Sequence, residues 1–193
     1  CAFKPYTPDG VEESVKFIEN NVLAAKALGA SFVCFAEGRL PQGVPEEEGW
    51  SRLVEVLKRG AEFAESNGIM LVDEFHPNLT ASTPEKAPKL IDEVGSPAFK
   101  GCLDFCHAYV ITNGDPVSMI KALGDRIGHV HIADASGEPG MHVPLGKGKV
   151  DYKACIAAIK EIGYQGEWTL CMHGYSFPEH AAKVCIAALE GLL

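Results

Sequence analysis

Short apolar segments alternate with amphipathic segments five times along the chain, and this alternation restricts the fold more than any other feature. Each segment is apolar over consecutive residues rather than at every second one, which is typical of parallel strands covered by helices on their faces. The segments are SFVCFAEG (31–38), IMLVDEF (69–75), FKGCLDF (99–105), IGHVHIAD (127–134) and EWTLCM (167–172). The pattern therefore predicts an α/β protein.

Segments with a helical spacing of apolar residues separate these strands. In the first, Val15, Ile18 and Val22 recur at intervals of three and four residues before Gly29 ends the pattern. Another is expected to begin with Thr83 as its N-cap. The expected helices cover residues 12–30, 49–68, 83–95, 115–125, 152–163 and 178–193. The strand centres are about 27 to 40 residues apart, the size of a βα unit.

The repeated βα unit predicts part of a (β/α)8 TIM barrel. A complete barrel of this kind has about 250 residues, whereas this chain has 193 and room for six units at most. We expect one domain over residues 1–193 that supplies strands 4–8, with the end of strand 3 in the opening CAF. The sequence is thus expected to begin part-way through the fold. A doubly wound sheet is the alternative, but no GxGxxG motif follows any strand.

The charge and cysteine content narrow the class of protein. A net charge of −9 and a pI near 5.2 argue against a non-specific binder of nucleic acid or of membrane surfaces. No apolar run approaches the roughly 20 residues of a membrane span, and no signal peptide is visible. Seven cysteines without a CxxC pair indicate reduced thiols rather than disulfides. We therefore expect a cytoplasmic protein.

Polar side chains recur where the predicted strands end. Glu74, Asp104, His131 and Cys171 lie at or near the ends of four successive strands. In a parallel barrel these ends converge on the face that carries the active site, and strand alternation places the four residues at comparable inward positions. Two carboxylates, an imidazole and a fourth donor suit one divalent metal ion, with Mn, Mg, Co and Zn as candidates.

Further polar residues close to these strand ends are candidates for contacting a substrate. His76 follows Glu74 by two residues, and His107 follows Asp104 by three. His173 lies beyond the last strand, and Glu37 ends the strand at 31–38. Each has a structural alternative, because a carboxylate in a loop is usually solvated and buried imidazoles are common in protein cores.

Four other residues are assigned supporting or structural roles, and Lys147 is a candidate for contacting a substrate. His129 is expected to pack beneath the site and His180 to lie on a helix surface. His142 and Asp134 are candidates for supporting positions or loops. Lys147 lies in the glycine-rich GKGK segment, where phosphate sites of this fold often form. An exposed polar loop is the alternative there.

The motifs LVDEFHP, LDFCHA, IGHVHIAD and PLGKGKVDYKACIAAIKEIGYQGEW resemble the sugar-phosphate isomerase/epimerase family, the xylose isomerase-like barrels. The resemblance extends over nearly the whole chain. This group includes ketose 3-epimerases, hydroxypyruvate isomerase and inosose dehydratase, with endonuclease IV as a distant relative. The motifs DxxH and HxHxxD are fairly specific for the superfamily, but they do not specify one substrate.

The resemblance implies that Glu74, Asp104 and His131 are metal ligands and that His107 contacts the substrate. The family's fourth ligand, a glutamate, corresponds here to Cys171 in YQGEWTLCM. A thiolate can bind a metal and would favour Zn, but a free thiol with a pKa near 8.5 is a poor base. Glu74 would be left as the main base, with Glu37 or His173 as substitutes for the second one.

The reaction implied by the resemblance is proton abstraction next to a carbonyl, with the metal stabilising an enediolate. We expect a metal-dependent isomerase or epimerase of a small ketose or 2-hydroxy-carbonyl compound, with Glu74 and His107 as catalytic residues. A dehydratase of the same family is the first alternative, because it needs only one base. Phosphodiester cleavage is the least expected activity, because the acidic charge disfavours DNA.

A non-catalytic barrel fragment is a further alternative. Five strands of an eight-stranded barrel leave two open edges, which must be covered or will associate. A second copy of the chain, or an N-terminal segment outside this sequence, would complete the barrel.

Overall fold

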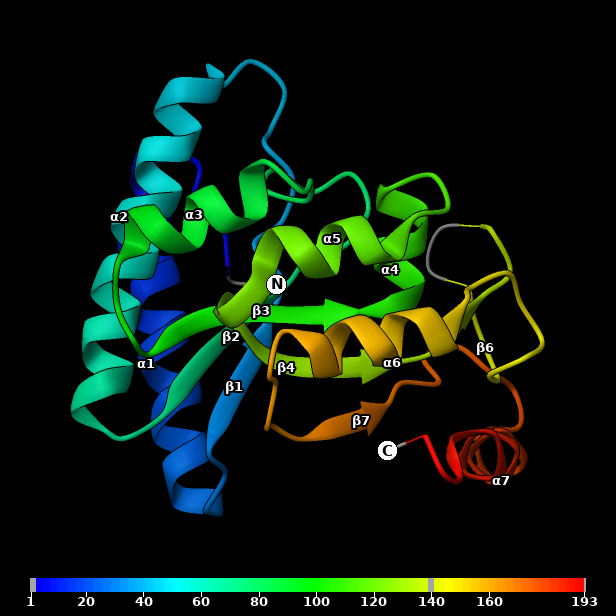
Figure 1. Cartoon of the computed structure of the whole chain (residues 1–193). Coiled ribbons are helices and arrows are strands. Elements are labelled where there is room, and N and C mark those ends of the chain that lie inside the picture. Colours follow the sequence, from blue (N-terminus) through cyan, green and yellow to red (C-terminus); the bar gives the residue numbers. More distant parts are fainter. Residues whose placement is uncertain (1–2, 139–140, 193) are drawn as a thin grey trace.

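The computed structural model describes residues 3–138 and 141–192, which form a curved sheet covered by helices (Figure 1). The strands are β1 (Phe32–Phe35), β2 (Met70–Glu74), β3 (Phe99–Asp104), β4 (Ile127–Ile132), β5 (Asp134–Ala135), β6 (His142–Val143) and β7 (Trp168–Leu170). The helices are α1 (Pro8–Leu28), α2 (Glu46–Ser66), α3 (Lys86–Val94), α4 (Phe105–Ile111), α5 (Pro116–Leu123), α6 (Tyr152–Glu161) and α7 (Pro178–Leu189), with a 3-10 turn η1 (Gly124–Arg126).

Five strands form one parallel sheet in the order of the chain, β1-β2-β3-β4-β7. Each strand pairs in parallel with the next, and helical crossovers connect them. Strands β5 and β6 form a separate antiparallel pair in the loop that follows β4. The five-stranded sheet is half of a TIM-barrel-like fold, which confirms the expected strand order and direction.

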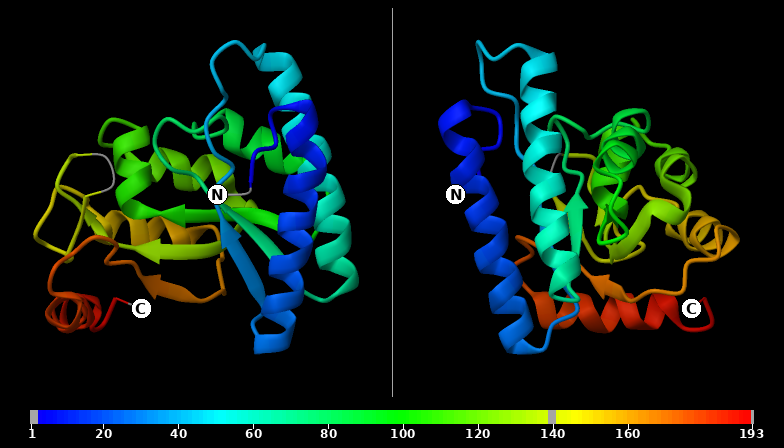
Figure 2. Two further views of the ribbon diagram at one scale, coloured as in Figure 1. Left: turned by 180° about the vertical axis from the view of Figure 1, so that it is seen from behind. Right: turned by 90° about the vertical axis from the view of Figure 1, so that its left-hand side faces the viewer.

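The helices pack on the outer face of the sheet. In Figure 1, α2 and α3 lie beside β2 and β3, and α5 and α6 continue the same layer over β4 and β7. Helix α1 lies alongside α2, where Gly60 permits close approach because a Cβ there would come within 2.7 Å of Ile18. The left-hand view of Figure 2 looks onto the opposite, concave face. No helix among the described residues is long and apolar enough to cross a membrane.

Strand alternation sorts the side chains between these two faces. Leu71 pairs in register with Phe99, and both are buried under the outer helices. The alternate positions carry polar side chains on the concave face. There Glu74 lies in register with Cys102, and Asp104 with His131. Because the period of a strand is two residues, a one-residue slip would move every polar group into the helical layer.

The structure contains a helix that the sequence analysis does not predict. Helix α4 begins directly after β3, in a segment expected to be a loop. The Asp104 side chain caps it, since Oδ1 accepts a hydrogen bond from the N–H of His107 at 2.9 Å. An aspartate at this position favours a helix start, so the strand passes into the helix without a connecting loop.

Several expected element boundaries also differ. The last strand ends at Leu170 rather than at residue 172, and β3 ends one residue earlier than expected. Helix α3 begins at Lys86, three residues after the predicted N-cap Thr83. Thr83 still stabilises this start, because its hydroxyl accepts a hydrogen bond from the Lys86 N–H at 3.1 Å.

Candidate metal and active site

The four side chains predicted as metal ligands lie at the carboxyl end of the sheet. Glu74 and Asp104 are the last residues of β2 and β3, and His131 lies one residue before the end of β4. Cys171 follows β7 directly, and its N–H donates to the carbonyl oxygen of Ile132 at 3.0 Å. This bond continues the parallel ladder by one residue, so all four residues reach the same edge of the sheet.

Glu74 lies between two imidazoles. Its Oε1 is 2.6 Å from Nδ1 of His131, and its Oε2 is 2.9 Å from Nε2 of His76. Burial alone would raise the pKa of Glu74, but the hydrogen bonds from His131 and His76 outweigh it and hold the pKa well below its usual range. The Glu74 carboxylate is therefore ionised and pointed at the centre of the site.

His131 connects this carboxylate to the rest of the group. Burial alone would lower its pKa, but hydrogen bonds to Cys171 and Glu74 raise it to about 10. A protonated imidazole balances the carboxylates in the metal-free arrangement. A metal ion would have to displace that proton, because His binds metals in its neutral form.

Asp104 has two separate contacts. One oxygen caps α4, as described above, and Oδ2 lies 3.2 Å from Nε2 of His142 and 3.9 Å from Nδ1 of His131. The residue is only 2% exposed. Its capping role and its predicted ligand role are therefore compatible, because each uses a different oxygen.

A row of histidines lies beside these donors. The ring centroids of His76 and His107 are 4.1 Å apart, those of His107 and His142 are 4.9 Å apart, and those of His142 and His173 are 6.4 Å apart. His107 is buried, and burial lowers its pKa to about 4. Its Nδ1 has no hydrogen-bond partner among the described residues. His76, His107 and His173 are thus brought to one site, as expected.

The donor set fits a divalent ion. The ligand atoms of Asp104, His131 and Cys171 lie within 4.8 Å of one another, as do those of Glu74, His76 and His107. The Glu74–His131 hydrogen bond joins the two groups. Donors bound to one ion at about 2.0–2.3 Å are up to about 4 Å apart, so small side-chain movements would close either group around an ion.

Comparison with known proteins identifies the family to which the chain belongs. The family model described as "Xylose isomerase-like TIM barrel" matches residues 3–191. The chain belongs to the xylose isomerase-like TIM barrel family. A fructoselysine 3-epimerase of Shigella flexneri is 29% identical over 163 residues, which are 82% of this chain and 58% of the relative. An L-ribulose 3-epimerase of Methylomonas sp. is 33% identical over 151 residues, 74% of this chain and 50% of the relative.

A solved structure of the same fold superimposes on nearly the whole five-stranded half-barrel. The IOLI protein with a binding zinc atom superimposes with a TM-score of 0.83 at 23% identity, covering 98% of this chain and 72% of that chain. This likeness shows the fold. The chain spans 50–58% of the length of the two curated relatives named above.

Glu37 lies apart from the other site candidates of this xylose isomerase-like barrel. It is 0% exposed, and its Oε1 accepts a hydrogen bond from the Ala81 N–H at 2.6 Å. Its own N–H donates to Oδ1 of Asp73 at 3.1 Å. Burial raises the pKa of Glu37 to about 7. The structure therefore turns this carboxylate away from solvent, where it binds the backbone of Ala81.

The backbone N–H groups of the glycine-rich loop around Lys147 bind a carboxylate of the same chain. The Asp134 carboxylate accepts hydrogen bonds from the N–H groups of Gly146, Gly148 and Val150 at 2.8–3.0 Å. These are the backbone donors that a phosphate would need. Lys147 is exposed beside them, and the Asp134 carboxylate occupies these donors in the structure.

His142 is the site residue that sequence reasoning placed least well. It is 4% exposed and lies 3.2 Å from Asp104. Its position depends on the β5–β6 pair, which folds the loop after β4 back over the site. Two-residue strands give too short a pattern to be found from sequence.

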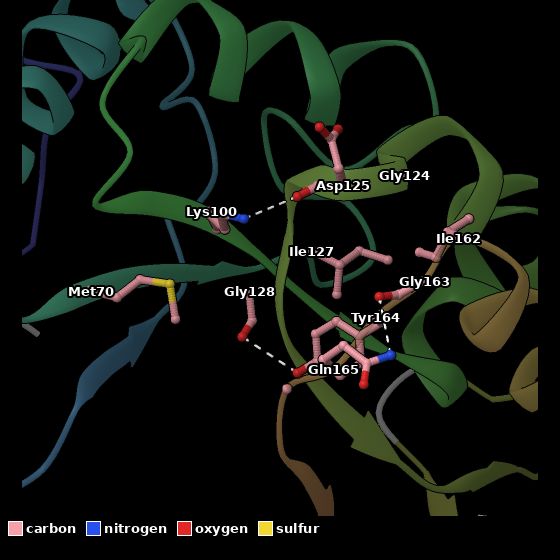
Figure 3. Close-up of a pocket in the computed structure, with 11 residues that line it drawn as sticks. Met70, Lys100, Gly124, Asp125, Ile127, Gly128, Ile162, Gly163, Tyr164 and Gln165 are labelled. Carbon is pink, nitrogen blue, oxygen red and sulfur yellow. Dashed lines mark hydrogen bonds between the residues drawn. The ribbon is translucent and has the colours of Figure 1, made fainter.

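A pocket of about 310 Å³ lies at the opposite, amino end of the strands (Figure 3). Its lining includes Met70, Lys100 and Tyr164, and the Lys100 amine donates to the Asp125 carbonyl oxygen at 3.0 Å. No histidine lies among its described lining residues. In barrels of this kind the amino end is associated with stability and the carboxyl end with catalysis, so we place the functional site at Glu74 and its neighbours.

Proposed function

We propose that this protein is a metal-dependent epimerase or isomerase of a small ketose or 2-hydroxy-carbonyl compound. The observation that carries this proposal is the convergence of Glu74, Asp104, His131 and Cys171 at one edge of a barrel whose relatives include 3-epimerases. Composition alone could not distinguish this from any other acidic α/β protein.

Glu74, Asp104, His131 and Cys171 would hold one divalent ion. When bound, the ion would polarise the substrate carbonyl and stabilise negative charge that develops on its oxygen. Three of the donors are oxygen and nitrogen, which Mn, Mg, Co and Zn accept, whereas the Cys171 sulfur favours Zn.

Glu74 is proposed as the base that removes the proton next to the carbonyl. The two imidazoles keep it ionised and fix its direction. In the metal-free arrangement its low pKa makes it a weak base, since a catalytic base works best with a pKa near the working pH. Metal binding requires a neutral His131, which loses its positive charge beside Glu74 but can still donate one N–H to the carboxylate.

His107 is proposed as the residue that hydrogen-bonds a substrate oxygen. Its lowered pKa keeps the ring neutral at physiological pH, so it can donate or accept a proton. The ring is held between His76 and His142. The free Nδ1 would otherwise remain an unsatisfied buried polar atom, which costs about 1–3 kcal/mol.

Cys171 gives a specific reason to retain a dehydratase as the second candidate. An epimerase must return a proton to the opposite face of the substrate, and a second carboxylate is well suited to that role. Here the position holds a thiol. A dehydratase needs one base and a leaving hydroxyl, so the chemistry at Glu74 could suffice for it.

Deuterium exchange distinguishes these reactions. The chain would be loaded with Mn²⁺, Co²⁺ or Zn²⁺ and incubated with ketoses and 2-hydroxy-carbonyl acids in D₂O, with a chelator-treated sample as control. The proposal predicts metal-dependent deuterium at the carbon next to the carbonyl, followed by the 3-epimer or the isomer. Loss of a hydroxyl would identify the dehydratase. An absence of exchange into every substrate with stoichiometric metal bound would contradict both activities.

A further inference from the structure

A second group of donors lies on the concave face, next to the proposed catalytic set. The sulfur atoms of Cys34 and Cys102 and a ring nitrogen of His131 all lie within 4.8 Å of one another. Cys34 is in β1, in register with Val72, and Cys102 is in β3, in register with Glu74. The group therefore spans four strands of the sheet, with β2 passing beneath the two thiols.

The positions of the two thiols suit a shared ion better than a disulfide bond. Strands β1 and β3 both pair with β2, one on each side. Neighbouring strands are about 4.8 Å apart, so the two Cα atoms are separated by roughly twice that distance. A disulfide requires Cα atoms within about 6.8 Å. An ion between the two sulfur atoms needs no such approach of the backbones.

The chemistry of these donors differs from that of the neighbouring set. Two thiolates and an imidazole are the ligands of a thiophilic ion such as Zn²⁺ or Cd²⁺, whereas Glu74 and Asp104 supply oxygen. Cys34 is exposed, so an ion can enter from the concave face, and Cys102 is buried behind it. We propose that Cys34, Cys102 and His131 bind a thiophilic divalent cation at a site that shares only His131 with the oxygen-rich set.

His131 belongs to both groups. Its Nδ1 contacts Glu74 at 2.6 Å, and the imidazole also meets Cys171. An ion bound at the two thiols would therefore draw on a side chain that the catalytic set also uses. Three protein ligands leave one position of a tetrahedral ion open to water or to a shared ligand.

Cadmium titration of the reduced chain tests the site directly. The background is Cys171→Ser, which removes the thiol of the catalytic set. Thiolate-to-cadmium charge-transfer absorption in the ultraviolet is then measured against added Cd²⁺. We expect saturation at one equivalent with the absorption of two thiolates. Cys34→Ser or Cys102→Ser should each halve the absorption and weaken binding at least about tenfold, since even outer-shell changes cost 10–100-fold in metal affinity.

The matched control is Cys155→Ser in the same background. Cys155 is a buried thiol of α6, outside the group. It should leave the titration unchanged. Cys34→Ser replaces an exposed side chain, so it keeps the test valid even if Cys102→Ser fails to fold. Unchanged absorption and affinity in Cys34→Ser would overturn the proposal. The readout is absorption rather than turnover, so it does not depend on the proposed enzymatic activity.

Discussion

Glu74 ends β2 and Glu37 follows the neighbouring strand β1, and both are largely buried, yet their surroundings give them opposite charge preferences. Glu74 lies between His131 and His76, and these imidazoles lower its pKa despite its burial. Glu37 lies against Asp73, another buried carboxylate, and burial raises its pKa to about 7. Burial favours the protonated form of both carboxyl groups, and the hydrogen bonds from the two imidazoles reverse that preference only at Glu74.

The difference between the two glutamates also predicts which one takes part in the reaction and which one stabilises the fold. Glu74 presents its charge to the concave face, where a cation or a substrate can meet it. The Glu37 carboxylate accepts a hydrogen bond from the Ala81 N–H, and the backbone N–H of Glu37 donates to Asp73. A buried carboxylate without a positive partner is most stable in its protonated form. Glu37 is therefore expected to matter for stability and Glu74 for activity.

The largest expected effect is on turnover. Glu74→Gln removes the proposed base and should lower kcat about 10²–10⁴-fold, the contribution usual for a positioned base. Glu37→Gln, which keeps an acceptor for the Ala81 N–H, should leave kcat within a few-fold. Steady-state assays of both variants with Mn²⁺ or Co²⁺ measure this. Equal losses in the two variants would break the distinction between the two glutamates.

A carboxylate introduced at position 171 extends the comparison between Glu74 and Glu37. Cys171→Glu would place a carboxylate beside His131, in surroundings like those of Glu74 rather than Glu37. If epimerisation lacks a second base, this variant should raise 3-epimerase activity by roughly 10²–10⁴-fold. Assays on ketoses with Mn²⁺, Co²⁺ and Zn²⁺ test it. A fall in activity, with dehydration retained, would instead support the one-base reaction.

The pH dependence of the free energy of unfolding tests the raised pKa of Glu37. Its pKa rises from 4.5 to about 7 on folding, so its stabilisation is present below about pH 4.5 and is lost as the pH rises through 7. A shift of this size corresponds to about 3 kcal/mol of unfolding free energy. Urea unfolding at pH 5 and 8.5 should show wild type losing more stability than Glu37→Gln. Parallel pH profiles would show that the Glu37 carboxylate is not perturbed.

The smallest expected effect comes from His129, beneath the site. Its Nε2 lies 2.9 Å from the Thr169 hydroxyl, and its ring is 4.5 Å from Phe32. His129→Ala should lower the free energy of unfolding by roughly 1–3 kcal/mol, since it removes the packing of a buried ring and its hydrogen bond to Thr169. Metal content should remain that of wild type. A variant that loses metal would place His129 among the ligands instead.

The sequence predicts the sheet well because buried parallel strands leave long apolar runs, and the carboxyl ends of such strands must share an edge. Glu74, Asp104 and His131 could be grouped on that basis alone. The short helix α4 could not be predicted from the sequence, because its seven residues carry no complete helical pattern.

Long-range partners account for the other differences. Nothing local distinguishes Glu37 from an exposed strand end, because its burial depends on Asp73 and Ala81, more than 35 residues away in the chain. The same holds for the backbone donors around Gly148, which bind Asp134 rather than a phosphate. Such contacts are set by tertiary packing and are invisible to a sequence window.

Metal binding by the site variants tests the central claim most directly. Calorimetric titration with Mn²⁺ or Co²⁺ should give one tight site in the wild type. Asp104→Ala and His131→Ala should each abolish tight binding while the circular dichroism spectrum is retained. Because Asp104 also caps α4, Asp104→Asn serves as a second variant that keeps a capping side chain. Stoichiometric binding of either ion by a protein lacking both Asp104 and His131 would contradict the proposed site.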